Sequence, residues 1–239
     1  VTDSRTKQGK ECLQNHAKLL QAAQQQYGVD PAIIAAIIGV ETYYGKRQGS
    51  YRVLDSLATL AFDYPKRPLF WRELKAFFAL AEEEQLDLAD IKGSYAGAMG
   101  YGQFIPSSFR HYAADGDFDG KRDLWYNPAD AIASVDNYFK RHAWRSGEAM
   151  TTAVTVSKPL PDDVINASLK PKWTVGELRT LGVNVPAAFN DNDSATVMQL
   201  KTQTDSEFWL GAHNFYVITR YNHSRLYAMA VYQLSEALR

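Results

Sequence analysis

The segment PAIIAAIIGVETY, residues 31–43, constrains the fold more than any other part of this 239-residue chain. Asp30 directly before it fits a helix N-cap, and Pro31 fits the first helical position. The helix that follows is apolar on all sides, so we expect it to lie at the centre of a buried core. We expect it to run from Pro31 to about Tyr43, with Gly45 as the stop signal after it.

Composition excludes several classes of protein. Hydrophobic residues make up 46% of the chain and charged residues 22%, as in soluble globular proteins. A formal net charge of −1 gives no electrostatic field for gripping nucleic acid. No run approaches the roughly 18 apolar residues of a membrane span. The single cysteine, Cys12, cannot build a disulfide framework and fits no metal-binding spacing.

The remaining sequence predicts a mainly helical chain with one β-rich region. The spacing of apolar residues predicts helices over 11–27, 53–62, 68–85, 106–113, 128–144 and 223–238. The segment 92–106, here called the glycine-rich loop, holds four glycines. β-branched residues broken by prolines predict short strands after residue 150, and Thr174 with Glu177 fits a capping box. We therefore expect an α+β fold, mainly α, with a small β-containing insertion over 151–210.

Glu41 ends the apolar run, and two interpretations of it are open. It is either a helix-end glutamate that faces water or a catalytic carboxyl group. Desolvation penalises the charged form of a carboxyl, which raises its pKa and keeps the acid protonated closer to neutral pH. The glycine-rich loop lets backbone approach a ligand closely and carries the polar residues Ser94 and Gln103. The 14 tyrosines can supply aromatic faces and hydroxyls for sugar rings.

Five motifs together carry a specific resemblance. They are IIGVETYYG, LDSLATLAF, KGSYAGAMGYGQFIPSS, NPADAIASVDNYFKRHAW and NFYVITRYNHSRLYAMAV. In this order they resemble the lytic murein transglycosylase B family of bacterial enzymes that cleave peptidoglycan. The resemblance runs from about Tyr27 to the C-terminus and is weakest over 151–210. The family begins with a further helical region, most of which is absent here, so we expect a truncated or processed chain.

The resemblance implies a fold and a set of site residues. It implies a lysozyme-like catalytic core formed by residues 1–60, 92–150 and 211–239, a helical flank over 61–91 and the small β domain over 151–210. Glu41 matches the single catalytic acid of the family, and Ser94 and Gln103 match polar residues that line the sugar site. The groups that hold the glycan are matched by Tyr138, Tyr221, Asn222 and Tyr227.

The implied reaction cleaves the bond between N-acetylmuramic acid and N-acetylglucosamine without water and leaves 1,6-anhydro-N-acetylmuramic acid ends. Glu41 would act first as the acid and then as the base. A lysozyme-type hydrolase is the alternative; it needs a second carboxylate, for which Asp55 and Asp63 are available. An inactive glycan-binding module is less favoured, because the motif around Glu41 is intact. For Tyr43 and Tyr44, catalytic and structural roles are equally open.

A second motif predicts a metal site. Asp115, Asp117 and Asp119 occupy positions 1, 3 and 5 of an EF-hand-like loop, and Lys121 would offer its backbone carbonyl at position 7. Position 12 lacks the usual glutamate, and the resemblance suggests that Asp130 closes the site instead. We predict one structural calcium ion in this segment, 115–130, here called the acidic loop, and no organic cofactor. The alternative is a solvated acidic turn.

The resemblance also implies partners and a location. Peptidoglycan glycan strands are the expected substrate, other cell-wall enzymes are candidate partners, and we expect a monomer. Peptidoglycan lies outside the cytoplasmic membrane, so the periplasm is the expected location. The sequence leaves open whether the full-length form is anchored to the outer membrane and whether it attacks glycan ends or mid-chain bonds.

Overall fold

The computed structural model describes residues 1–63, 67–202 and 205–239. Residues 64–66 of the predicted helical flank and 203–204 of the predicted β region lie outside this part of the chain. The described residues form two compact units, one of residues 1–141 and 233–239 and the other of residues 142–232. The fold is mainly helical with a smaller β region, as predicted, and the strands of that region form an antiparallel sheet. No helix in the described ranges is long and apolar enough to cross a membrane.

Helix α3 (Pro31–Thr42) forms the centre of the first unit. The Oδ1 atom of Asp30 accepts a hydrogen bond from the backbone N–H of Ala32 at 2.8 Å, which confirms the predicted helix start. Every residue from Ala32 to Gly39 is buried. Three helices pack against α3, namely α1 (Asp3–Asn15), α2 (Ala17–Tyr27) and α7 (Pro128–Arg141). Each buried isoleucine of α3 contributes about 1.5–3 kcal/mol to folding.

Two predicted helices differ from the structure. The pattern over 11–27 predicted one helix, but the chain breaks at His16, where φ is −114° and ψ is 20°. The first helix also begins earlier, where the side chain of Thr2 caps its N-terminus. Helix α7 ends at Arg141 and does not reach residue 144, since Ala143 adopts a left-handed conformation with φ of 62°.

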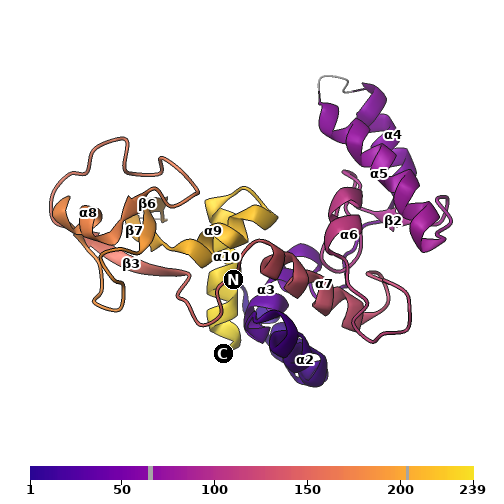
Figure 1. The fold of residues 1–239 in the computed structure, drawn as a ribbon, viewed down its shortest axis with the longest axis horizontal. Coiled ribbons are helices and arrows are strands. Elements are labelled where there is room, and N and C mark those ends of the chain that lie inside the picture. The colour runs from indigo at the N-terminus through magenta and orange to yellow at the C-terminus, as the bar shows by residue number, and fades with distance from the viewer. Residues whose placement is uncertain (64–66, 203–204) are drawn as a thin grey trace. The chain divides into compact units, whose positions relative to one another are not determined.

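The rest of the first unit consists of a helical hairpin and the segments that join it to the core. Helices α4 (Val53–Asp63) and α5 (Pro68–Glu84) lie side by side (Figure 1), and α5 packs on α6 (Pro106–Tyr112). Strands β1 (Tyr51–Arg52) and β2 (Lys92–Gly93) pair antiparallel. This pairing places the start of the glycine-rich loop beside the segment that follows α3.

The second unit contains a five-stranded antiparallel sheet with the order β4-β6-β7-β3-β5. Its strands are β3 (Thr151–Val156), β4 (Trp173–Thr174), β5 (Val183–Asn184), β6 (Ser194–Lys201) and β7 (Ser206–Gly211). Helix α8 (Val175–Thr180) begins at the predicted capping box, in which Glu177 accepts from Thr174 N at 2.7 Å. The sheet leads into α9 (His213–Tyr221) and α10 (Arg225–Leu238), whose last residues belong to the first unit.

Arg179 fixes the main chain that follows α8. Its Nη2 group donates to the carbonyl oxygens of Val185 at 3.3 Å, Pro186 at 3.0 Å and Phe189 at 3.0 Å. Its Nη1 group forms an ion pair with Asp191. One side chain therefore holds the whole segment 185–191 in place.

Asp136 on α7 is a carboxyl group inside the first unit. It is 0% exposed, and within the described residues neither of its oxygens accepts a hydrogen bond of regular geometry, although the backbone N–H of Val29 lies near the carboxyl. Burial raises the pKa of Asp136 to about 7, and the backbone N–H of Val29 offsets part of the rise. The folded chain therefore keeps a proton that the unfolded chain loses near pH 4. The stabilisation is complete below about pH 4 and is lost as the pH rises to about 7.

We expect Asp136→Asn to remove this pH dependence. From about pH 4 to 7 the unfolding constant of the unmodified chain should rise by up to about tenfold per pH unit relative to the variant. The ratio should be level above pH 7. Urea unfolding at intervals from pH 4 to 8 measures it, with the exposed Asp162→Asn as the control. Identical pH dependence of the Asp136 variant and the unmodified chain would contradict the assignment.

Candidate active site

Glu41 lies in the last turn of α3 and is partly exposed. The next residue, Thr42, is buried, and its hydroxyl donates to the carbonyl oxygen of Tyr101 in the glycine-rich loop at 2.8 Å. The same hydroxyl accepts from the N–H of Gly45 at 3.0 Å. These contacts fix the end of α3 against the glycine-rich loop.

The turn after α3 is left-handed over three residues. The helix ends at Thr42, close to the predicted end at about Tyr43. Tyr43 and Tyr44 have φ values of 54° and 59°, and Gly45, the predicted stop, has 82°. A left-handed conformation costs roughly 1–2 kcal/mol for each non-glycine residue. Contacts to α1 offset this cost: the Tyr44 hydroxyl donates to a carbonyl of α1 at 2.9 Å, and the Tyr43 hydroxyl accepts from Gln8 at 2.7 Å. Both tyrosine hydroxyls therefore have structural partners.

Ser94 begins the glycine-rich loop and caps its turn. Its Oγ atom accepts hydrogen bonds from the backbone N–H groups of Ala96 at 3.2 Å and Ala98 at 3.1 Å. Because these two bonds use the acceptor capacity of the hydroxyl, its hydrogen is left to donate. Ser94 is thus oriented as a donor for a ligand oxygen.

Gln103 ties the far side of the loop to the segment after α3. Its φ is 51°, and its Nε2 group donates to the carbonyl oxygens of Gly100 at 3.0 Å and Gln48 at 3.2 Å. Both amide hydrogens are thereby used, so Oε1 is the atom with which Gln103 can bind a ligand donor. Sequence reasoning missed Gln48 and Thr42, because their roles depend on segments that are remote in the sequence.

Tyr138 on α7 packs against Phe104 of the glycine-rich loop. It is 7% exposed, and its ring lies 6.0 Å from that of Phe104 and 4.8 Å from that of Tyr112, centroid to centroid. Only the small exposed part of Tyr138 is left for a ligand.

The other three predicted glycan residues lie in the second unit, where α9 ends and α10 begins. Tyr221 is the last residue of α9, and Asn222 is exposed. The turn is closed by hydrogen bonds from Ser224 N to Asn222 O at 2.7 Å and from Tyr227 N to Ser224 Oγ at 3.2 Å. The fold thus places Tyr221, Asn222 and Tyr227 at the junction of α9 and α10 in the second unit, and Glu41, Ser94, Gln103 and Tyr138 in the first unit.

Asp55 and Asp63 were the carboxylates available for a hydrolase. Asp55 forms an ion pair with Arg52 at 2.8 Å, and the hydrogen bond from Arg52 holds its pKa below the usual range. Asp63 is exposed at the end of α4. Neither environment is desolvated in a way that prepares a carboxylate for catalysis.

The acidic loop brings three of its predicted metal ligands together. One carboxylate oxygen each of Asp115, Asp117 and Asp130 lies within 4.8 Å of the others. Burial raises the pKa of Asp130, the N–H groups of Gly116 and Asp123 lower it in part, and Asp117 and Asp115 raise it. Converging carboxylates that repel one another fit a divalent cation with hard oxygen ligands.

Asp119 and Lys121 are engaged with the loop itself. The Oδ1 atom of Asp119 accepts from the backbone N–H of Lys121 at 2.9 Å, and the N–H of Asp119 donates to Asp115 at 3.2 Å. Within the described residues, the cluster of carboxylates does not include Asp119.

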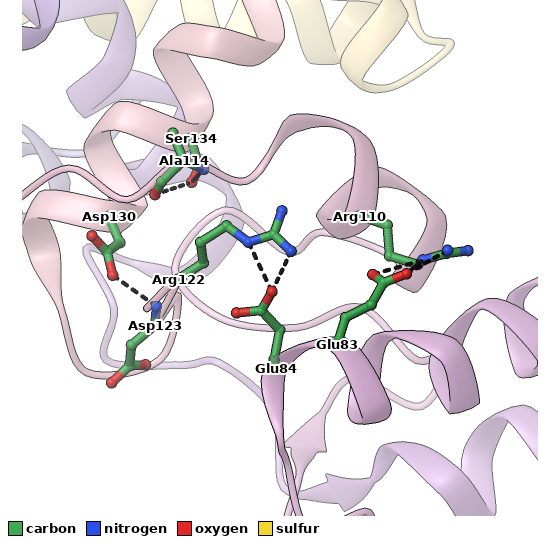
Figure 2. Close-up of polar contacts among 8 residues, drawn as sticks. All are labelled: Glu83, Glu84, Arg110, Ala114, Arg122, Asp123, Asp130 and Ser134. Atoms are coloured by element: carbon green, nitrogen blue, oxygen red, sulfur yellow. Dashed lines mark hydrogen bonds and ion pairs between the residues drawn. The ribbon is translucent and has the colours of Figure 1, made fainter. Parts of the chain in front are cut away.

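Polar contacts hold the acidic loop between α5 and α7 (Figure 2). Arg122 forms an ion pair with Glu84 at the end of α5. The Oδ2 atom of Asp130 accepts from the backbone N–H of Asp123 at 2.7 Å, and Ser134 Oγ accepts from the backbone N–H at position 114 at 2.8 Å. The positions of the clustered carboxylates are therefore set by neighbouring helices as well as by the loop.

The chain matches the family model described as Transglycosylase SLT domain over residues 1–236. It is 45% identical over 221 residues to membrane-bound lytic murein transglycosylase B of Escherichia coli K12. That alignment covers 92% of this chain and 60% of the relative, so the chain spans well under the full length of that protein.

Three solved structures, of two proteins, are closely similar. The lytic transglycosylase SltB1 from Pseudomonas aeruginosa is 45% identical with a TM-score of 0.96, and the match covers 100% of this chain and 79% of that one. The Escherichia coli lytic transglycosylase Slt35 in complex with bulgecin A is 43% identical with a TM-score of 0.91, covering 100% and 74%. Slt35 in complex with calcium is 42% identical with a TM-score of 0.89, covering 100% and 75%. The lysozyme-like fold that the resemblance implied is thereby confirmed.

The contact between the segment after α3 and the glycine-rich loop gives a prediction about Gly49. Its φ is +95°, and an added Cβ would lie 2.1 Å from the carbonyl oxygen of Gly93. Gly147 has a φ of +77° but nothing within 4 Å of an added Cβ. Gly147→Ala should therefore lose only the roughly 1–2 kcal/mol of left-handed strain, and Gly49→Ala should lose distinctly more. Urea unfolding of both variants measures the difference, and equal losses would contradict the close approach.

Proposed function

Because the chain belongs to the transglycosylase SLT domain family, we propose that it is a lytic transglycosylase of peptidoglycan. It cleaves the bond between N-acetylmuramic acid and N-acetylglucosamine without water and leaves 1,6-anhydro-N-acetylmuramic acid ends. The observation that carries the proposal is the position of Glu41. This carboxyl ends a buried apolar helix next to Thr42, which binds the glycine-rich loop at 2.8 Å.

Glu41 serves as acid and then as base. The protonated carboxyl gives its proton to the glycosidic oxygen, and the C1–O bond to N-acetylglucosamine breaks. The acetamido oxygen of the sugar eases the positive charge that develops at C1. Glu41, now a carboxylate, takes the proton from the C6 hydroxyl of N-acetylmuramic acid, which attacks C1 and closes the anhydro ring. Glu41 regains its proton, no water is consumed, and one carboxyl suffices where most glycosidases need two.

The residues around Glu41 orient the sugar. Ser94, with its acceptor capacity used by two backbone N–H groups, donates to the acetamido oxygen. Gln103, with both amide hydrogens engaged, accepts through Oε1. Tyr221, Asn222 and Tyr227 are the further groups that would hold the glycan, and Tyr138 supports the loop.

A lysozyme-type hydrolase is the second candidate. It differs in using water, so its products carry reducing ends. Its two available carboxylates disfavour it: Asp55 is exposed and paired with Arg52, and Asp63 is exposed, so neither has the desolvated environment of a catalytic carboxylate.

We also propose that the acidic loop binds one structural calcium ion. Asp115, Asp117 and Asp130 would hold it, and Lys121 would add its backbone carbonyl. The ion would offset the repulsion among these carboxylates and stabilise the loop. The relative Slt35 has been solved in complex with calcium, which supports the proposal.

The proposed location is the periplasm, because peptidoglycan lies outside the cytoplasmic membrane. The name of the membrane-bound relative supports an envelope location. Glycan strands are the proposed partner of a monomeric enzyme, with other cell-wall enzymes as further candidates.

Glu41→Gln should abolish the reaction and leave the fold intact. We expect activity on purified peptidoglycan to fall by at least about a hundred- to ten-thousand-fold, the contribution of general acid–base catalysis. Ser94→Ala should cost less, because it removes one orienting hydrogen bond. Glu82→Gln, at an exposed position of α5, is the matched control and should be fully active.

Mass spectrometry of the released fragments distinguishes the two reactions. A transglycosylase gives muropeptides one water lighter than hydrolytic products, with no new reducing ends. Reducing ends would make the protein a lysozyme-type hydrolase, and a fully active Glu41→Gln variant would remove Glu41 from the chemistry.

Calcium should bind to chelator-treated protein with measurable heat and raise its melting temperature. At about a hundredfold excess over Kd the stabilisation amounts to about 2.7 kcal/mol. Asp130→Asn should lose the calcium-dependent increment, and the exposed Asp163→Asn should keep it. Only the increment is compared, because Asp130→Asn also relieves repulsion in the metal-free state. Absence of both heat and melting shift in the unmodified chain would reject the site.

A further inference from the structure

Gln48 lies where three segments of the first unit meet. Its Nε2 group donates to the carbonyl oxygens of Gly45 at 3.1 Å and Trp125 at 2.9 Å. The backbone carbonyl oxygen of Gln48 accepts from Nε2 of Gln103 at 3.2 Å. One residue therefore joins the turn after α3, the end of the acidic loop region and the glycine-rich loop.

The side-chain amide of Gln48 forms its hydrogen bonds to the described residues through its N–H groups and not through its oxygen. Its Oε1 atom is buried and has no hydrogen-bond partner in the part of the chain that the structure describes. Leaving such an acceptor unpaired costs about 1–3 kcal/mol. The opposite orientation of the amide would set Oε1 against two carbonyl oxygens, so Nε2 must face them. An apolar side chain could fill this space without the cost of an unpaired oxygen. The two hydrogen bonds that Nε2 donates offset that cost and account for an amide at this position.

The backbone around Gln48 is equally constrained. Gly49, which follows it, packs so closely on Gly93 O that no other side chain fits, as the 2.1 Å distance for an added Cβ indicates. This contact fixes the backbone at Gly49 and thereby the direction in which the side chain of Gln48 extends from the main chain. The amide of Gln48 is thereby delivered to Gly45 and Trp125.

From Gln48 a short series of hydrogen bonds leads to Glu41. The N–H of Gly45 donates to Thr42 Oγ1 at 3.0 Å, and Thr42 directly follows Glu41 in α3. On the other side, the N–H of Trp125 donates to Asp123 Oδ1 at 2.9 Å, which links Gln48 to the acidic loop. Gly45 in the turn after α3 is thus held through its N–H by Thr42 and through its carbonyl oxygen by Gln48.

We propose that Gln48 is a positioning residue that sets the direction of the Glu41 carboxyl relative to the glycine-rich loop. The proposal rests on the proposed catalytic role of Glu41. Gln48 itself does not contact the glycan, because its amide hydrogens are engaged and its Oε1 is buried. Its loss should therefore lower kcat, through misalignment of the acid, and leave KM nearly unchanged.

The test compares Gln48→Met with Gln8→Met. The first variant keeps the length of the side chain and the carbonyl that binds Gln103, but loses both N–H donors. The second is a matched control, since Gln8 also binds this turn, through the Tyr43 hydroxyl at 2.7 Å and Lys46 at 2.6 Å, but from α1. Rates on soluble peptidoglycan fragments are divided by the folded fraction of each variant, taken from its unfolding curve, so that lost stability does not count.

We expect kcat per folded molecule to fall at least about tenfold in Gln48→Met, because a small misplacement of a catalytic group lowers the rate by up to about a hundredfold. The KM of this variant should stay within about twofold of the unmodified value. Gln8→Met should stay within about twofold in both. Unchanged kcat in Gln48→Met, or an equal loss in Gln8→Met, would overturn the positioning role and leave the proposed function standing.

Amide hydrogen exchange provides a readout that does not depend on the reaction. In Gln48→Met the N–H groups of Gly45 and Trp125 should exchange faster, and that of Ala32, at the other end of α3, should not change. If the unmodified chain has no transglycosylase activity, the proposed function fails on its own. Unchanged exchange at Gly45 would show that Gln48 does not hold the turn.

Discussion

The hydrogen bond from the Thr42 hydroxyl to the Tyr101 carbonyl is the contact on which the candidate site depends. Helix α3 is rigid because it is buried on all sides, but the glycine-rich loop has little regular structure of its own. A polar bond in a buried setting is stronger than one in water, and its loss leaves an unpaired group. Thr42 is 1% exposed, so this bond couples the two elements at the residue next to Glu41.

Sequence reasoning succeeded where the determinant is local. Asp30 and Pro31 specify the start of α3, and Thr174 with Glu177 specifies the start of α8, since each cap involves residues within one turn. The left-handed turn at Tyr43 and Tyr44 is supported instead by hydrogen bonds to α1, a distant segment, and a pattern of apolar residues does not contain such contacts. The same holds within the site, where a motif identified Glu41 but not Gln48, whose partners lie far away in the sequence.

Helix α7 carries two buried carboxyl groups, and the fold compensates their negative charge in different ways. Asp130 receives hydrogen bonds from two backbone N–H groups and faces two further carboxylates. A cation suits such a cluster. Asp136, six residues along the same helix, faces no such cluster, and its carboxyl oxygens have no hydrogen-bond partner among the described residues. There a proton is the only means of removing the charge.

The hold of Arg179 on the segment 185–191 bears on how this protein can vary among its relatives. Three of the four groups that Arg179 binds are backbone carbonyls, which every amino acid possesses. The path of the segment therefore depends on Arg179 together with Val185 and Phe189, whose side chains are buried in a hydrophobic core. The exposed positions 186–188 can change during evolution while this path is kept, whereas a change at position 179 removes all four contacts at once.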